Sequence, residues 1–84
     1  MGHRPFRVPV KLRAGETGIF VACSAWEALE FLERDWPGER DNAYLRACAA
    51  CRDAVDGFRA PEGARRAVEN AARAAGLLAE MAEP

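Results

Sequence analysis

Apolar and charged residues alternate along residues 6–13 of the chain. The apolar positions are Phe6, Val8, Val10 and Leu12. A period of two predicts a β-strand with one buried face and one face in water. Because Pro9 cannot donate a hydrogen bond to a neighbouring strand, we expect this strand to lie at the edge of a sheet.

A second apolar run follows a turn around Gly15. Its successive residues Ile19, Phe20 and Val21 make residues 17–23 apolar on both faces. Together the two segments predict an antiparallel β-hairpin over about residues 5–23. An isolated hairpin is marginally stable, so we expect helices to cover one face and either sheet curvature or another subunit to cover the other.

The next segment has the residue spacing of a capped helix. Ser24 and Glu27 match a capping box, in which the hydroxyl of Ser24 accepts from the amide of Glu27 and the carboxylate of Glu27 accepts from the amide of Ser24. At the other end, Pro37 disfavours helical geometry at Trp36. We therefore expect a helix over residues 25–36.

One stripe of this helix is apolar, and two large rings lie beside it. The stripe consists of Ala25, Ala28, Leu29, Leu32 and Trp36. Trp26 and Phe31 lie at its two flanks. We expect these two rings to cover the edges of the core or to contact a partner.

Two further helices are expected over residues 42–56 and 61–76. Asp41 and Asn42 supply capping side chains, and Gly57 follows the first of these helices. Its apolar face comprises Tyr44, Cys48, Cys51, Val55 and Phe58. The third helix opens at Pro61, and its apolar face comprises Ala64, Ala67, Val68, Ala71, Ala74, Ala75 and Leu78. So many alanines predict close helix packing, with residues 77–84 as a frayed tail.

These segments predict one small α+β domain over residues 1–84, a two-stranded hairpin packed on three helices in the order ββααα. Half of the residues are apolar and 30% are charged, as in globular domains. The net charge of −1 gives the chain as a whole no attraction to nucleic acid or to an anionic membrane. No run of 18 apolar residues occurs, so we expect a cytoplasmic protein with no membrane partner.

Charge is distributed unevenly along the chain. Residues 1–13 carry four basic residues and no acid, whereas acids outnumber bases from Glu27 to Asp41. We expect mutual attraction between the first strand and the first helix. A contact between two subunits is the alternative interpretation.

The three cysteines suggest redox or metal chemistry only weakly. Cys48 and Cys51 form a CxxC pair, but both lie inside the expected helix, where cysteine behaves as a small apolar residue. A zinc site would require these residues to converge with Cys23 and His3. We therefore expect no metal and no cofactor, and keep a thiol redox or zinc protein as an alternative.

The second and third helices also suggest a helix-turn-helix. Arg65, Arg66 and Arg73 would contact the nucleic acid. Glu62 and Glu69 interrupt that face, and the spacing favours ordinary ion pairs of Glu62 with Arg66 and of Glu69 with Arg73. We therefore do not expect nucleic acid to be the partner, and keep a nucleic-acid-binding helix pair as an alternative.

No set of residues predicts catalysis. The sole histidine, His3, lies in the terminal arm without a serine or carboxylate beside it, and Ser24 is committed to a helix cap. The sequence identifies no small-molecule ligand. We expect the protein not to be an enzyme.

The order of several short motifs resembles domain-of-unknown-function family 982, a group of small bacterial proteins. The motifs are Pro9-Val10, residues 24–28 (Ser-Ala-Trp-Glu-Ala), Leu32, Trp36-Pro37, residues 47–51, Ala64-Arg65, Ala71-Ala72 and Ala75-Gly76. The resemblance covers nearly the whole chain. It implies a compact α+β domain without an established biochemical role. Val68 stands where the resemblance leads us to expect a bulkier aromatic residue, a difference that concerns packing.

The remaining hypothesis is a noncatalytic interaction or regulatory module, with self-association as the first partner. The candidate interface comprises Val8, Val10, Trp26 and Phe31. The strand from Val8 to Leu12 offers an edge for pairing, and the alanine-rich third helix offers a close-packing face.

Overall fold

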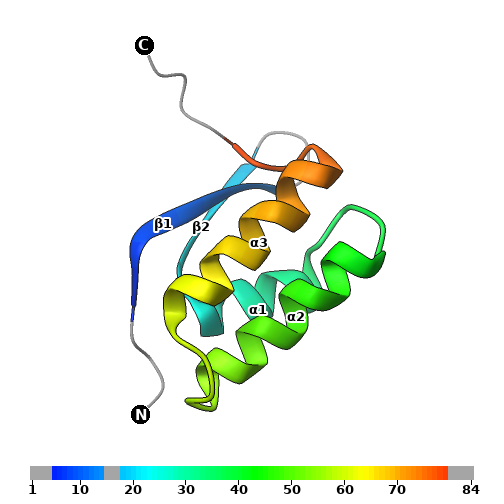
Figure 1. Ribbon diagram of the computed structural model, residues 1–84. Helices are drawn as coiled ribbons and strands as arrows, with labels where there is room; N and C mark the ends of the chain where they lie inside the picture. Colours follow the sequence, from blue (N-terminus) through cyan, green and yellow to red (C-terminus); the bar gives the residue numbers. More distant parts are fainter. Residues whose placement is uncertain (1–4, 15–17, 80–84) are drawn as a thin grey trace.

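The computed structural model describes residues 5–14 and 18–79, and it contains a hairpin followed by three helices (Figure 1). The strands are β1 (Pro5–Ala14) and β2 (Gly18–Ser24). The helices are α1 (Ala25–Arg34), α2 (Asn42–Val55) and α3 (Pro61–Ala75). This order confirms the expected α+β fold with ββααα topology. His3 and Gly15 lie outside the described residues.

The hairpin is antiparallel and regular only near its turn. Val10 lies opposite Ala22, and Leu12 lies opposite Phe20. Between Pro5 and Val10 the register shifts, and the side-chain alternation of β1 fails there. Phe6, Val10 and Leu12 are buried as expected, but Val8 is 58% exposed. The expectation of a buried Val8 is therefore wrong, because the irregular register turns this part of β1 away from the core.

A short segment after α3 pairs with the other side of β1. The amide of Arg13 donates to the carbonyl of Leu77 at 2.8 Å, and the amide of Ala79 donates to the carbonyl of Lys11 at 2.9 Å. Gly76 makes this return possible, because its φ of 73° is strained for any residue with a side chain. The expected frayed tail is thus wrong for residues 77–79, and residues 80–84 lie outside the described part. β1 is an inner strand at residues 11–13.

The start of α1 is capped, as the sequence indicates. The hydroxyl of Ser24 accepts from the amide of Glu27 at 3.3 Å. The carboxylate of Glu27 accepts from the amide of Cys23 at 2.8 Å, one residue earlier than expected. The reciprocal capping therefore also fixes the end of β2.

The end of α1 comes two residues earlier than expected. The helix stops at Arg34, and Asp35 takes a non-helical conformation. Trp36 lies outside the helix and is buried, and its indole Nε1 donates to the carbonyl of Glu39 at 3.0 Å. Pro37 restricts the backbone of Trp36 to extended geometry, so the ring enters the core from the loop.

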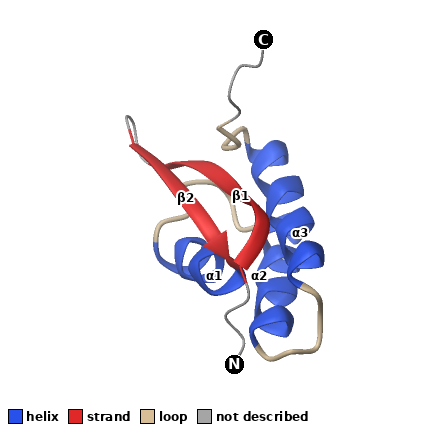
Figure 2. Ribbon diagram, turned by 90° about the vertical axis from the view of Figure 1, so that its left-hand side faces the viewer, coloured by secondary structure: helices blue, strands red, loops and turns tan. Residues whose placement is uncertain are grey.

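The helices cover one side of the hairpin (Figure 2). α3 packs along β1, and α1 packs against β2. α2 contacts α1 and α3 and forms the outer layer. Within the described residues, no helix is both long and apolar enough to span a bilayer.

Phe31 belongs to the core and not to a flank of α1. It is buried, and its ring stacks on that of Phe20 with centroids 5.1 Å apart. The ring of Trp36 packs edge-on against that of Phe31. The ring of Tyr44 packs against Trp36, with centroids 5.5 Å apart. The hydroxyl of Tyr44 donates to the carbonyl of Leu32 at 2.7 Å. This aromatic cluster (Phe20, Phe31, Trp36 and Tyr44) connects the hairpin to α1 and α2.

Besides Val8, three apolar positions expected in the core are exposed. Ala74 and Ala75 face solvent at the end of α3, although Ala64, Val68 and Ala71 are buried. Phe58 is 83% exposed, because α2 ends at Val55 and Gly57 turns the chain at a φ of 89°. A residue beyond the end of a helix does not continue its apolar stripe.

Replacing Ser24 with alanine is expected to lower the free energy of unfolding by about 1 kcal/mol, because an amide at the start of α1 loses its acceptor. Urea unfolding followed by circular dichroism would measure the change. Glu30→Ala on the same helix is the control. An equal loss in both variants would contradict the capping role.

Replacing Tyr44 with phenylalanine is expected to lower the free energy of unfolding by about 1 to 2 kcal/mol, because the buried hydrogen bond to Leu32 is lost while the ring remains. The same unfolding measurement applies. Unchanged stability would show that this hydrogen bond contributes nothing net.

Candidate functional site

The face of the hairpin turned away from the helices is uncovered. We define the outer face by the alternating residues Lys11 and Arg13 on β1 and Ile19, Val21 and Cys23 on β2. Ile19 is 56% exposed and Val21 is 42% exposed. The sequence indicated a second strand that needs cover on both sides, and within the described residues only the inner side is covered.

Within residues 5–14 and 18–79, no strand pairs with the edge of β2 that lies away from β1. Because Arg13 and Lys11 bond to residues 77–79, the backbone groups of Leu12 point the other way, toward Phe20. Antiparallel geometry then directs the N–H and C=O groups of Ile19 and Val21 away from β1. Among the described residues these groups have no hydrogen-bond partner.

The prediction that β1 is the free edge strand is therefore wrong for residues 11–13. The sequence favoured Val8 to Leu12 as the free edge, because Pro9 cannot pair within a sheet. Pro9 does lie in the irregular part of β1, but residues 77–79 cover the strand at Lys11 and Arg13. No local pattern in the sequence indicated that pairing, since it joins opposite ends of the chain.

Two of the four predicted interface residues are buried within the chain. Val10 contributes to the inner face of the hairpin, and Phe31 stacks on Phe20. Their prediction as interface residues is wrong for this reason. Val8 and Trp26 are exposed, Trp26 by 43% at the start of α1, directly after β2. Of the predicted interface residues, only Val8 and Trp26 therefore remain on the surface. Ile19 and Val21 are exposed apolar residues that the prediction did not include.

The strand cations do not pair with the acids of α1. Arg7, Lys11 and Arg13 have no ion pair with any described residue, while Glu33 of α1 pairs with Arg52 of α2 at 2.8 Å. The expected attraction between the first strand and the first helix is therefore not realised as ion pairs. β2 has no charged residue, so the hairpin has an uncharged strand beside a basic one.

Arg65 holds both acids of α3. Its guanidinium pairs with Glu62 at 2.8 Å and with Glu69 at 2.9 Å. The pKa of the Glu62 carboxyl is lowered, chiefly by the hydrogen bond from Arg65, with a weaker attraction from Arg7. The expected pairs of Glu62 with Arg66 and of Glu69 with Arg73 are wrong. Arg65 is therefore engaged within its own helix, which weakens the helix-turn-helix interpretation.

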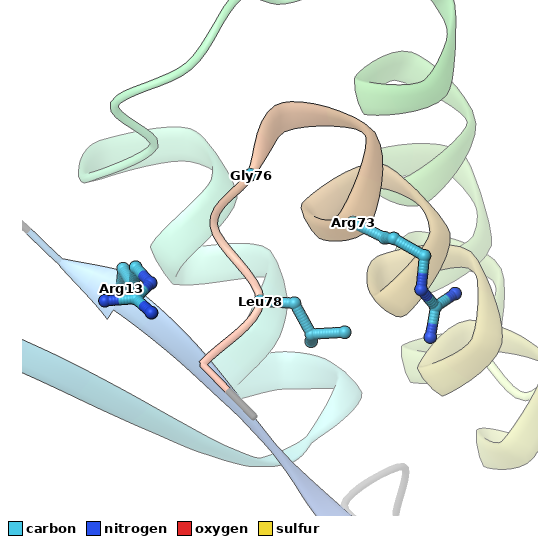
Figure 3. A pocket seen from close by; sticks show the side chains of 4 residues that line it. All are labelled: Arg13, Arg73, Gly76 and Leu78. Carbon is cyan, nitrogen blue, oxygen red and sulfur yellow. The ribbon is translucent and has the colours of Figure 1, made fainter. Parts of the chain in front are cut away.

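Arg13 and Arg73 line a hollow beside Gly76 and Leu78 (Figure 3). The two arginine side chains lie on opposite sides of Leu78 and do not converge on a common point. A small anion would therefore meet one guanidinium at a time.

The paired cysteines of α2 face the core. Cys48 and Cys51 are buried, and burial raises the pKa of Cys51 to about 12, with the neighbouring Cys48 adding to the shift. Cys23 is exposed on β2. Within residues 5–14 and 18–79, no group of three potential ligands is placed to hold a metal ion. The Cys51 thiolate is therefore strongly disfavoured, and both side chains of the pair are enclosed by the core.

Similarity to known proteins agrees with this architecture. A family model described as "Protein of unknown function (DUF982)" matches residues 8–79. The NMR structure of Agrobacterium tumefaciens protein Atu1219, a structural genomics target, is 30% identical with a TM-score of 0.79. That match covers 95% of this chain and 80% of the other. None of the curated proteins matches the chain.

In the folded protein, iodoacetamide is expected to label Cys23 alone, because Cys48 and Cys51 are buried and little of the Cys51 thiolate forms near neutral pH. Peptide mass spectrometry before and after urea unfolding would locate the label. Cys23→Ala is the control and should remain unlabelled until it unfolds. Native labelling of Cys48 or Cys51 would contradict their placement in the core.

Proposed function

The chain belongs to the DUF982 family, and we propose that it is a small noncatalytic protein-interaction domain that binds through the outer face and free edge of its hairpin. A regulatory role would act through the same contact. The proposal places the domain in the cytoplasm, where three free thiols stay reduced.

One observation carries this proposal, the uncovered face of a two-stranded sheet. Folding buries the inner face against α1 and α3 but leaves Ile19 and Val21 in water. Exposed apolar side chains beside unpaired backbone groups are the features that strand-addition interfaces use, since the main chain supplies hydrogen bonds and the side chains supply contact area. Trp26 and Val8 extend the exposed apolar area of the domain.

The alternatives identified from the sequence have less support. A thiol redox or zinc function would need Cys48 and Cys51 to be accessible, and both are buried. A nucleic-acid-binding helix pair would need Arg65 to contact phosphates or bases, but its guanidinium is engaged in ion pairs with Glu62 and Glu69. Neither alternative explains the uncovered hairpin.

A photoactivatable amino acid at position 21, in protein produced at its natural level in cells, is expected to give discrete cross-linked products, because the side chain of Val21 lies on the proposed contact surface. Ala49, exposed on α2, is the control position. Denaturing gels and mass spectrometry would identify the products. Cross-linking at neither position, or the same products at both, would overturn the proposal.

A further inference from the structure

The protection of the sheet edges is distributed unequally. Natural edge strands are usually defended against pairing by charges, proline or a bulge. In this hairpin all the protective features lie on β1. They are the charged residues Arg7, Lys11 and Arg13, Pro9, and the irregular register. β1 is nevertheless the strand that residues 77–79 cover. β2, of sequence GIFVACS, has no charge, proline or bulge, and no other described strand pairs with its outer edge.

We infer that β2 pairs antiparallel with β2 of a second copy of the chain, about a two-fold axis at Phe20. This inference rests on the proposed function and names its partner. It extends the hairpins of two copies into one continuous sheet. The contact is isologous, so the same residues serve on both sides and the assembly closes as a dimer.

The register follows from the backbone groups that are available. The amide of Cys23 already donates to Glu27. Registers that pair the two strands through the Cys23 amide would therefore lack one interstrand hydrogen bond from each copy. An axis at Phe20 places Ile19 directly opposite Val21 of the partner subunit. In this register the N–H and C=O groups of Ile19 and Val21 are all used, and they are the groups that point away from β1.

The side chains are self-complementary in the same register. On the outer face, Ile19 lies beside Val21 of the partner subunit, and β-branched cross-strand pairs are favourable. On the inner face, the two copies of Phe20 become cross-strand neighbours. Phe20 is the half-buried member of the aromatic cluster, so the ring of the second copy's Phe20 would shield its remaining exposed surface from water.

The charges permit edge pairing and oppose stacking of two outer faces. In the paired arrangement the basic β1 strands are separated by three strand spacings, about 14 Å, and the Debye length is about 8 Å at physiological salt. Repulsion between them is therefore screened. Stacking two outer faces would instead bring Lys11 and Arg13 toward the same cations of the other copy.

The contact area is small, so the dimer is expected to be weak. Its apolar part consists mainly of Ile19, Val21 and Phe20 from each copy. These side chains bury less surface than the total of about 1,200 to 2,000 Å² that stable protein–protein interfaces bury. We expect a dissociation constant of about 1 μM to 1 mM.

Sedimentation velocity over a concentration series tests the inference. The wild-type chain is expected to pass from monomer to dimer. Ile19→Glu/Val21→Glu should weaken dimerisation more than about tenfold, because like charges directly opposite across the axis repel. Within one chain the new carboxylates face Arg13 and Lys11, so the hairpin should remain folded by circular dichroism. Leu45→Glu/Ala49→Glu adds the same two charges on the exposed side of α2, so it is the matched control and should leave dimerisation unchanged.

A mixed sample of isotope-labelled and unlabelled chains tests the register. An intermolecular nuclear Overhauser effect between the two Phe20 Hα protons is expected, since these protons approach closely in a non-hydrogen-bonded antiparallel pair. A chain that stays monomeric up to millimolar concentration, or a dimer insensitive to Ile19→Glu/Val21→Glu, would overturn the inference. If position 21 then cross-links to a different protein in cells, the interaction function stands and only the second copy is wrong.

Discussion

The fold depends on burying the inner face of a hairpin that is too small to be stable alone. The stack of Phe20 on Phe31 begins this burial, because it joins β2 to the helix that follows it. Trp36 and Tyr44 extend the contact to the loop after α1 and to α2. α3 covers the other strand, with buried alanines that let it approach α2 closely. Removing the hairpin would leave these helices with an exposed apolar surface.

The same constraint explains why one side of the hairpin remains open. The described residues form three helices, and two of them cover the inner face while α2 covers those two. Nothing in the described residues is left to cover Ile19 and Val21. The return of residues 77–79 closes the edge of β1 but cannot reach β2, which lies on the far side of β1. The open edge and the open face therefore have one origin, and β2 contributes to both.

The residues that look most reactive in the sequence have structural roles. Cys48 and Cys51 fill the space between helices, and Ser24 caps α1. Arg65 ties two acids along α3. Each of these groups is satisfied inside the domain. The groups that remain for a partner are apolar side chains and main-chain atoms of β2, which is why binding through strand pairing suits this molecule better than chemistry.

The sequence by itself determined the elements and their order, because these depend on local physics. Alternation predicts the strands, capping by Ser24 and Glu27 starts α1, and Pro37 and Gly57 limit the helices. It could not assign Val8 and Phe31 to surface or core, since a shifted register exposes Val8 and the ring of Phe20 on the neighbouring strand covers Phe31. It could not identify the free edge either. Only the tertiary structure decided that, because the pairing of residues 77–79 with β1 joins segments more than 60 residues apart and leaves β2 open.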